Sequence, residues 1–199
     1  MKKKILILSG GISKERLISL DTGTQVSKEL KKNGYKVKIS EPDFSLKTNI
    51  RKFKPDIIFN ALHGRYGEDG YIQLILENER IKYTHSGVKA SSICINKLVS
   101  KRLFIKNKIS TPKYTIIKSN LKNNYKKIFE HAKKKFNFPV VIKPINEGSS
   151  VGVYICTRQN FLKNLKKLHH ESEILIEQFI PGREIQVAIM GDKKLGAIE

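Results

Sequence analysis

The sequence has few cysteines, no tryptophan and no long apolar run, and these shortages exclude several classes of protein. Cys94 and Cys156 do not form a C-x-x-C pair, which excludes a zinc ribbon or dithiol redox motif. We expect both cysteines to be reduced and partly buried. No apolar stretch approaches the roughly 20 residues that span a bilayer. The short apolar run Ile5–Leu8 is too brief for a secretory signal core and predicts a β-strand instead.

Acidic residues are also scarce, with 18 Asp and Glu against 39 Lys and Arg, which gives a formal charge of +21. Lysine supplies 32 of the 39 cations, whereas arginine is the side chain favoured for bidentate recognition of phosphate and guanine. The lysine clusters, such as 133–135 and 166–167, are expected on the solvated faces of helices. The charge therefore does not predict a specific nucleic-acid binder, although it helps to attract nucleotides and other anions.

The first hundred residues alternate strand and helix patterns. Strands are predicted at 4–8, 35–39 and 56–61, and helices at 15–32 and about 70–78. This β-α-β-α order predicts a parallel sheet with ligands at the carboxyl ends of its strands.

The pattern changes near residues 110–112. Beyond them we expect strands at 114–117, 153–156 and 174–176, another strand ending at 144, helices at about 124–136 and 158–169, and a hairpin that pairs 184–190 with 195–198. The second half is therefore predicted to mix helices with antiparallel strands.

Three loops carry residue types suited to chemistry, although the P-loop motif G-x-x-x-x-G-K-[ST] and the G-x-G-x-x-G fingerprint are both missing. Residues 10–13 combine two glycines with a predicted helix start, where Glu15 either serves a site or only complements the helix dipole. In residues 63–70, His63 follows the third predicted strand, and it has either a functional or a structural role. Residues 143–152 combine Lys143 with a Gly/Ser turn, which is either a phosphate clamp or a plain hairpin turn.

The order and spacing of these segments resemble the D-alanine–D-alanine ligases of the ATP-grasp superfamily, over the whole chain. The matching stretches are Gly10-Gly11-x-Ser13-x-Glu15-Arg16-x-x-Ser19-Leu20, Ala61-Leu62-His63-Gly64-x-x-Gly67-Glu68-Asp69-Gly70, Tyr83-Thr84-x-Ser86-Gly87-x-x-Ala90-Ser91 with Lys97, Lys143-Pro144-x-x-Glu147-Gly148-Ser149-Ser150-Val151-Gly152, and Ile176-Glu177.

The resemblance implies an α/β fold in which a pre-ATP-grasp parallel-sheet lobe precedes a small α+β ATP-grasp lobe, with a third lobe truncated. It implies lobes at 1–96 and 97–183 and the start of a C-terminal lobe at 184–199. It also implies that ATP phosphorylates one D-alanine and that a second D-alanine attacks the acyl phosphate, for peptidoglycan precursor synthesis. Mg²⁺ ligands are expected in the family's remaining third, so no metal ligand is expected in this chain.

The resemblance assigns roles to particular residues. Glu15 and Ser149 form the catalytic group, Glu15 holds the ammonium of the first D-alanine, and His63 faces the carboxylate of that substrate. The residues expected to bind ATP are Lys97, Lys143, Ser150, Glu177, Gln178, Phe179, Ile180 and Glu184.

Other interpretations stay open at this point. A related ATP-grasp ligase, such as a D-alanine–D-lactate ligase, would share these motifs, and a non-catalytic binding protein or truncated gene product would keep the fold alone. We expect a cytoplasmic protein that does not contact a membrane and whose partners are D-alanine and ATP. Formation of a homodimer is left open.

Overall fold

A computed structural model describes residues 2–118 and 124–199, so Met1 lies outside it. Its first sheet is parallel, with strand order β2-β1-β3. The strands are β1 (Lys4–Leu8), β2 (Lys36–Ser40) and β3 (Ile57–Asn60). Residues 5–8 of the central strand β1 are apolar because helices cover both faces of the sheet, and Leu6, Ile7 and Leu8 are fully buried.

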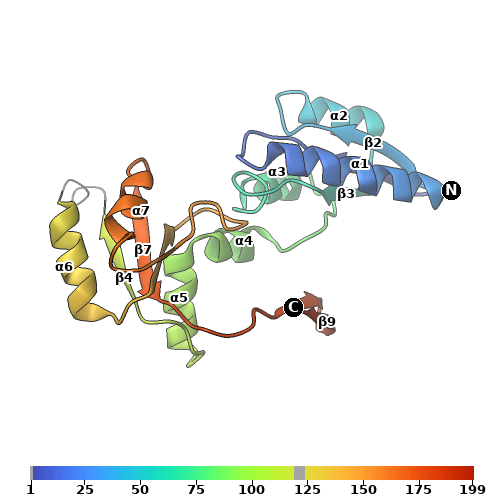
Figure 1. Ribbon diagram of the computed structural model, residues 1–199. Helices are drawn as coiled ribbons and strands as arrows, with labels where there is room; N and C mark the ends of the chain where they lie inside the picture. Colours follow the sequence, from blue (N-terminus) through green and yellow to red (C-terminus); the bar gives the residue numbers. More distant parts are fainter. Residues whose placement is uncertain (1, 119–123) are drawn as a thin grey trace.

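Three helices complete this first lobe (Figure 1). They are α1 (Arg16–Lys32), α2 (Leu46–Phe53) and α3 (Tyr71–Asn78). Leu6 and Leu8 pack in one cluster with apolar residues of α2 and α3, whereas Ile5 and Ile7 pack on the opposite face against α1. The predicted parallel α/β lobe is thus confirmed.

Two consecutive helices, α4 (Val88–Ile95) and α5 (Lys97–Lys106), follow the first lobe. The Asn96 side chain accepts the Val99 N–H at 3.0 Å and caps α5. In Figure 1 these helices lie between the first lobe and the second sheet, and α4 packs against α3 and α5.

The second lobe contains an antiparallel sheet of order β4-β7-β5-β6 and the helices α6 (Tyr125–Lys135) and α7 (Phe161–Lys167). Its strands are β4 (Tyr114–Lys118), β5 (Val140–Pro144), β6 (Tyr154–Cys156) and β7 (Glu173–Gln178). One face of the sheet packs Val140 and Ile142 against Phe161 and Leu165 of α7. Side chains alternate along a strand, so Lys143 and Glu177 belong to the opposite face.

The chain continues into the hairpin β8 (Gln186–Met190) and β9 (Lys193–Ile198), as predicted, with Gly191 and Asp192 at its turn. All residues of both strands are exposed, and Figure 1 shows the hairpin apart from both sheets. None of the described helices combines the length and the apolar character needed to cross a membrane.

The predictions differ from the structure at several elements. Helices α2, α4 and α5 were not predicted, since each spans only two or three turns and gives a short periodic pattern. Helix α7 is shorter than the predicted 158–169, because the Asn160 side chain accepts the Thr157 N–H at 2.9 Å in a turn before it. Cys156 is buried and Cys94 is exposed, so the expectation of partial burial was wrong for both.

Candidate functional site

The glycine loop after β1 is fastened to the ends of two neighbouring strands. Gly10 and Gly11 have φ values of +92° and +78°, a region that favours glycine. The Ser19 hydroxyl accepts the Gly10 N–H at 2.8 Å and donates to the Ala61 carbonyl at 2.7 Å. Ser19 is fully buried, so this side chain joins the glycine loop to the loop that carries His63.

An ion pair supports the other side of the same loop. Arg16 Nη2 lies 2.7 Å from Glu41 Oε1, and Glu41 Oε2 accepts the Gly11 N–H at 3.2 Å. The hydrogen bond from Arg16 lowers the pKa of the Glu41 carboxyl below its ordinary value. The contacts that Glu41 makes with Arg16 and with the loop therefore favour its ionised form.

Glu15 lies at the start of α1, where the sequence predicted it, and its side chain is buried, with the residue only 5 % exposed. Oε1 has no hydrogen-bond partner among the described residues. A Cβ atom built on Gly64 would stand 2.8 Å from Oε2, and one built on Gly148 would stand 3.7 Å away. The carboxylate thus lies between loops of the two lobes, beside the residue that precedes Ser149.

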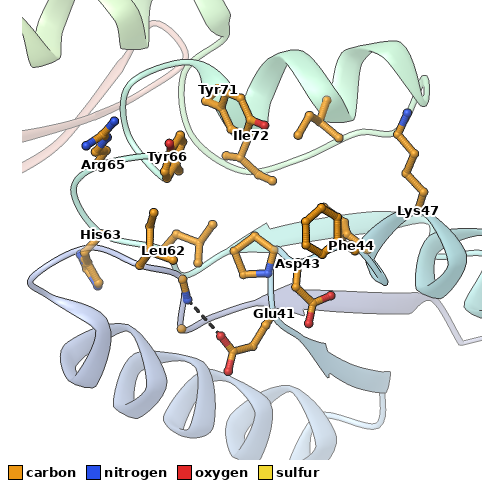
Figure 2. Close-up of a pocket in the computed structure, with 16 residues that line it drawn as sticks. Glu41, Asp43, Phe44, Lys47, Leu62, His63, Arg65, Tyr66, Tyr71 and Ile72 are labelled. Atoms are coloured by element: carbon orange, nitrogen blue, oxygen red, sulfur yellow. Dashed lines mark hydrogen bonds between the residues drawn. The ribbon is translucent and has the colours of Figure 1, made fainter.

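His63 follows β3 and contacts side chains of its own lobe. Its Nε2 lies 3.3 Å from Thr22 Oγ1, and its Nδ1 lies 3.8 Å from Glu68 Oε1. It also lines a cavity of about 520 Å³ with Leu62, Tyr66 and other residues (Figure 2). Glu15 and the predicted ATP-binding residues do not line that cavity, although Gly64, the residue after His63, borders the Glu15 carboxylate.

The predicted Gly/Ser turn connects β5 to β6. Ser149 and Ser150 have φ values of +44° and +59° and are exposed, while the Val151 N–H donates to the Gly148 carbonyl at 2.9 Å. Two successive non-glycine residues in the left-handed region cost conformational free energy, and such strain is concentrated at functional sites. The turn is therefore a better candidate for ligand binding than for simple chain reversal.

Two predicted phosphate-binding lysines lie near this turn. Lys97 begins α5, and its Nζ donates to the Ile145 carbonyl at 3.4 Å and to the Glu147 carbonyl. Burial, together with the positive charge of Lys143, lowers the pKa of Lys97. Lys143 Nζ pairs with Glu177 Oε1. The structure thus brings Lys97, Lys143 and Glu177 together.

The remaining predicted residues follow Glu177 along the chain. Phe179 is half-buried, whereas Gln178, Ile180 and Glu184 are exposed. Gln178 is the last residue of β7, and the other three lie in the segment that connects β7 to β8. Among the described residues, no three His, Cys, Asp or Glu side chains gather as a metal site.

Two features of the site were missed by the sequence analysis. Lys101 is buried and pairs with Glu177 Oε2 at 2.8 Å. Lys101 follows Lys97 by four residues on α5, so both lysines lie on one face of the helix. This spacing is visible in the sequence and could have indicated that Lys101 lies near the site. Lys14 pairs with Glu147 at 2.8 Å across the two lobes, and no local pattern indicated that contact.

Comparisons with known proteins show which family model and which relatives this chain resembles. Residues 103–199 match the family model described as D-ala D-ala ligase C-terminus. The chain is 70% identical over its full length to a D-alanine–D-alanine ligase of Pelagibacter ubique, of which it covers 65%. It is 44% identical to a ligase of the same name from Wolbachia pipientis, over 98% of this chain and 60% of that protein.

Solved structures show the same fold. A D-alanine–D-alanine ligase from Bacillus anthracis is 31% identical with a TM-score of 0.82, over 98% of this chain and 63% of that one. The ATP complex from the same organism is 29% identical with a TM-score of 0.81, over 98% and 65%. The chain thus spans 60 to 65% of the length of the two curated relatives named above.

Proposed function

Because this chain belongs to the D-alanine–D-alanine ligase family, we propose that it takes part in the ATP-dependent ligation of two D-alanines for peptidoglycan precursor synthesis. The observation that carries the proposal is the buried Glu15 carboxylate, whose Oε1 has no partner among the described residues. A buried carboxylate oxygen is normally paired. A substrate ammonium would supply the missing donor and the opposite charge.

Three side chains are proposed to bind the first D-alanine. Glu15 binds its ammonium, with the Ser149 hydroxyl in the same hydrogen-bonded group, and His63 faces its carboxylate. Support comes from the Gly148 backbone, since a Cβ atom there would lie 3.7 Å from Glu15 Oε2. These contacts fix the orientation in which the carboxylate of the first D-alanine meets ATP.

ATP is assigned to the edge of the second lobe. Lys97, Lys143 and Ser150 bind its phosphates, because two ammonium groups and a hydroxyl on a strained turn match an anionic chain of oxygens. The base and ribose are assigned to the segment after Ile176, namely Glu177, Gln178, Phe179, Ile180 and Glu184. We further propose boundaries between lobes at 96/97 and 183/184.

The proposed reaction has two steps. A carboxylate oxygen of the first D-alanine attacks the γ-phosphorus and ADP leaves; the amine of the second D-alanine then attacks the acyl carbon and phosphate leaves. Lysine charge at Lys97 and Lys143 offsets the charge that develops on the transferred group. Mg²⁺ would add further charge neutralisation when bound, and the described residues provide no set of ligands for it.

A cytoplasmic location is proposed because ATP is the phosphoryl donor and both cysteines are free thiols, as is usual in a reducing compartment. Homodimer formation stays a prediction.

The test joins this chain to the part of the Pelagibacter ubique relative that it does not cover; we call this the completed ligase. D-Alanine-dependent phosphate release and dipeptide formation are expected from the completed ligase and not from the 199-residue chain alone. A folded completed ligase that makes no dipeptide overturns the proposal.

Lys143→Ala tests the ATP assignment in the same protein. We expect ATP binding to weaken by about 1.5–3 kcal/mol, since a charge-assisted contact to phosphate is lost. The exposed Lys126→Ala is the matched control. ATP affinity within about twofold of the unmodified protein by calorimetry would remove Lys143 from the site.

A further inference from the structure

Lys101 carries a buried charge that the reaction itself does not require. It lies on α5, and its side chain is only 7% exposed, as is that of Glu177. Lysine has three ammonium donors, and Lys101 Nζ has three acceptors: Glu177 Oε2 at 2.8 Å, Thr111 Oγ1 at 2.8 Å and the Pro112 carbonyl at 3.0 Å. The Tyr114 ring lies 5.1 Å from the same nitrogen. Lys101 is therefore fully satisfied and fixed.

The Lys143 side chain is more exposed than that of Lys101 and has fewer partners among the described residues. Its side chain is 21% exposed, and Glu177 Oε1 is its only ion-pair partner among the described residues. It lies on β5 two residues beyond Val141, which is opposite Glu177 on β7. Such diagonal neighbours share a face of the sheet within reach of a long side chain. Glu177 thus bridges one fixed lysine and one that borders solvent.

The charges explain why both lysines are needed. If Lys143 turned toward a phosphate group and Glu177 had no other partner, a buried carboxylate would be left uncompensated, which is strongly unfavourable. Lys101 removes that cost, because it stays bound to Oε2 while Lys143 leaves Oε1. Without Lys101, the whole negative charge of Glu177 would act on Lys143 and would hold it more tightly.

We propose that Lys101 is a positioning residue that acts through Glu177: it keeps the carboxylate compensated so that Lys143 is available to exchange Glu177 for a phosphate oxygen. The inference rests on the proposed function for the identity of the ligand, but the coupling between Lys101 and Lys143 can be measured without any ligand.

The experiment is competitive acetylation of the 199-residue chain followed by mass spectrometry, with the exposed Lys106 of α5 as the internal reference. Only the unprotonated, unpaired amine reacts, so the rate at Lys143 reports its availability. Lys101→Met is expected to lower that rate at least threefold, and Glu177→Gln is expected to raise it at least threefold. Lys101→Arg, which keeps the charge, is expected to leave the rate near that of the unmodified chain.

The double variant Lys101→Met/Glu177→Gln separates positioning from a merely structural role. Since Lys101 acts through Glu177, the Lys143 rate in the double variant should equal that in Glu177→Gln. A rate that stays as low as in Lys101→Met overturns the proposal, as does an unchanged or higher Lys143 rate in a folded Lys101→Met. The double variant buries no charge at either position. If Lys101→Met does not fold, the Lys143 rate in the double variant is compared with that in Glu177→Gln, and a lower rate in the double variant overturns the proposal.

Inorganic tripolyphosphate, which has neither base nor ribose, then identifies the ligand chemistry. It should slow acetylation of Lys143 in the unmodified chain and leave Lys106 unaffected. If the variants give the expected rates but tripolyphosphate does not protect Lys143, the coupling between Lys101 and Lys143 is upheld. The phosphate role of Lys143 and the nucleotide site proposed above are then overturned. If tripolyphosphate protects Lys143 but Lys101→Met has no effect on its rate, the phosphate role of Lys143 is upheld and the coupling to Lys101 is overturned.

Discussion

Lys14 Nζ and Glu147 Oε1 lie 2.8 Å apart, although 133 positions separate the two residues in the chain. Lys14 belongs to the glycine loop of the first lobe and Glu147 precedes the Gly/Ser turn of the second. Glu171 of the second lobe adds a weaker contact to Lys14 at 3.6 Å. The ion pair therefore joins the two loops that carry Glu15 and Ser149, each one or two residues away.

Removing this contact should loosen the loops more than it destabilises the protein. Lys14→Met is expected to change the free energy of unfolding by less than about 1 kcal/mol, because the pair is partly exposed. Hydrogen exchange at residues 10–14 and 147–152 should become faster, while exchange in β1 stays slow. High salt should reproduce the effect in the unmodified chain. Lys126→Met is the matched control; equal exchange in both variants would show that the pair does not hold the loops together.

Ser19 should contribute more to stability than an ordinary surface serine. Ser19→Ala leaves the Gly10 N–H and the Ala61 carbonyl without their shared partner in a buried position, which is expected to cost about 1–3 kcal/mol. Ser92→Ala on the exposed face of α4 is the control and should stay within about 0.5 kcal/mol. Urea unfolding measures both. A Ser19→Ala cost as small as that of the control would mean that other groups satisfy the two loops.

How far the sequence predicted the molecule depends on the range of the interactions involved. Strand β1, the turn after Lys143 and the C-terminal hairpin were predicted because each is marked by a local pattern of apolar, glycine or serine residues. The convergence of the Glu15 loop with the Gly148 loop was expected from the family resemblance. Local periodicity alone contains nothing about contacts between the two lobes.

The contacts of Glu177 illustrate what local patterns leave out. Its relation to Lys143 depends on the register of β5 against β7, and a shift of one residue would turn Lys143 to the other face. Its relation to Lys101 depends on how α5 packs against the second sheet, and α5 itself was not predicted. A buried lysine is unusual without a partner, yet only tertiary structure identifies that partner.

The Arg16–Glu41 pair predicts how stability responds to acid. The pKa of Glu41 is lowered in the folded protein from its ordinary value of 4.5, chiefly by the Arg16 hydrogen bond. The unfolded carboxyl therefore binds its proton at higher pH than the folded one. The contribution of the pair is complete above that ordinary value and is lost as the pH falls through the lowered folded pKa.

Urea unfolding between pH 7 and pH 3 tests this relation. Glu41→Gln should be less stable than the unmodified chain at pH 7, and the difference should shrink in acid as the natural carboxyl becomes protonated. The exposed Asp192→Asn on the hairpin turn is the control and should run parallel to the unmodified chain. A Glu41→Gln curve that also runs parallel would contradict the lowered pKa.

Glu15 allows the sharpest separation between a substrate-binding role and a role in starting α1. Its Oε1 is buried without a partner among the described residues, and its side chain caps no backbone N–H of the helix. A helix-dipole role alone predicts that Glu15→Gln loses about 0.3–1 kcal/mol of stability and keeps near-normal kinetics. A substrate role predicts instead the loss of a charge-assisted hydrogen bond to the ammonium of the first D-alanine, worth about 1.5–3 kcal/mol.

In the completed ligase, Glu15→Gln is therefore expected to raise the KM for the first D-alanine roughly tenfold to a hundredfold. The KM for ATP should stay within about twofold, because the lysines that would face the phosphates are unchanged. The exposed Asp21→Asn on the same helix controls for the loss of one negative charge. Steady-state kinetics with each substrate varied in turn distinguishes the two roles: equal rises in both KM values, or a stability loss with unchanged KM values, would leave Glu15 as a structural residue at the start of α1.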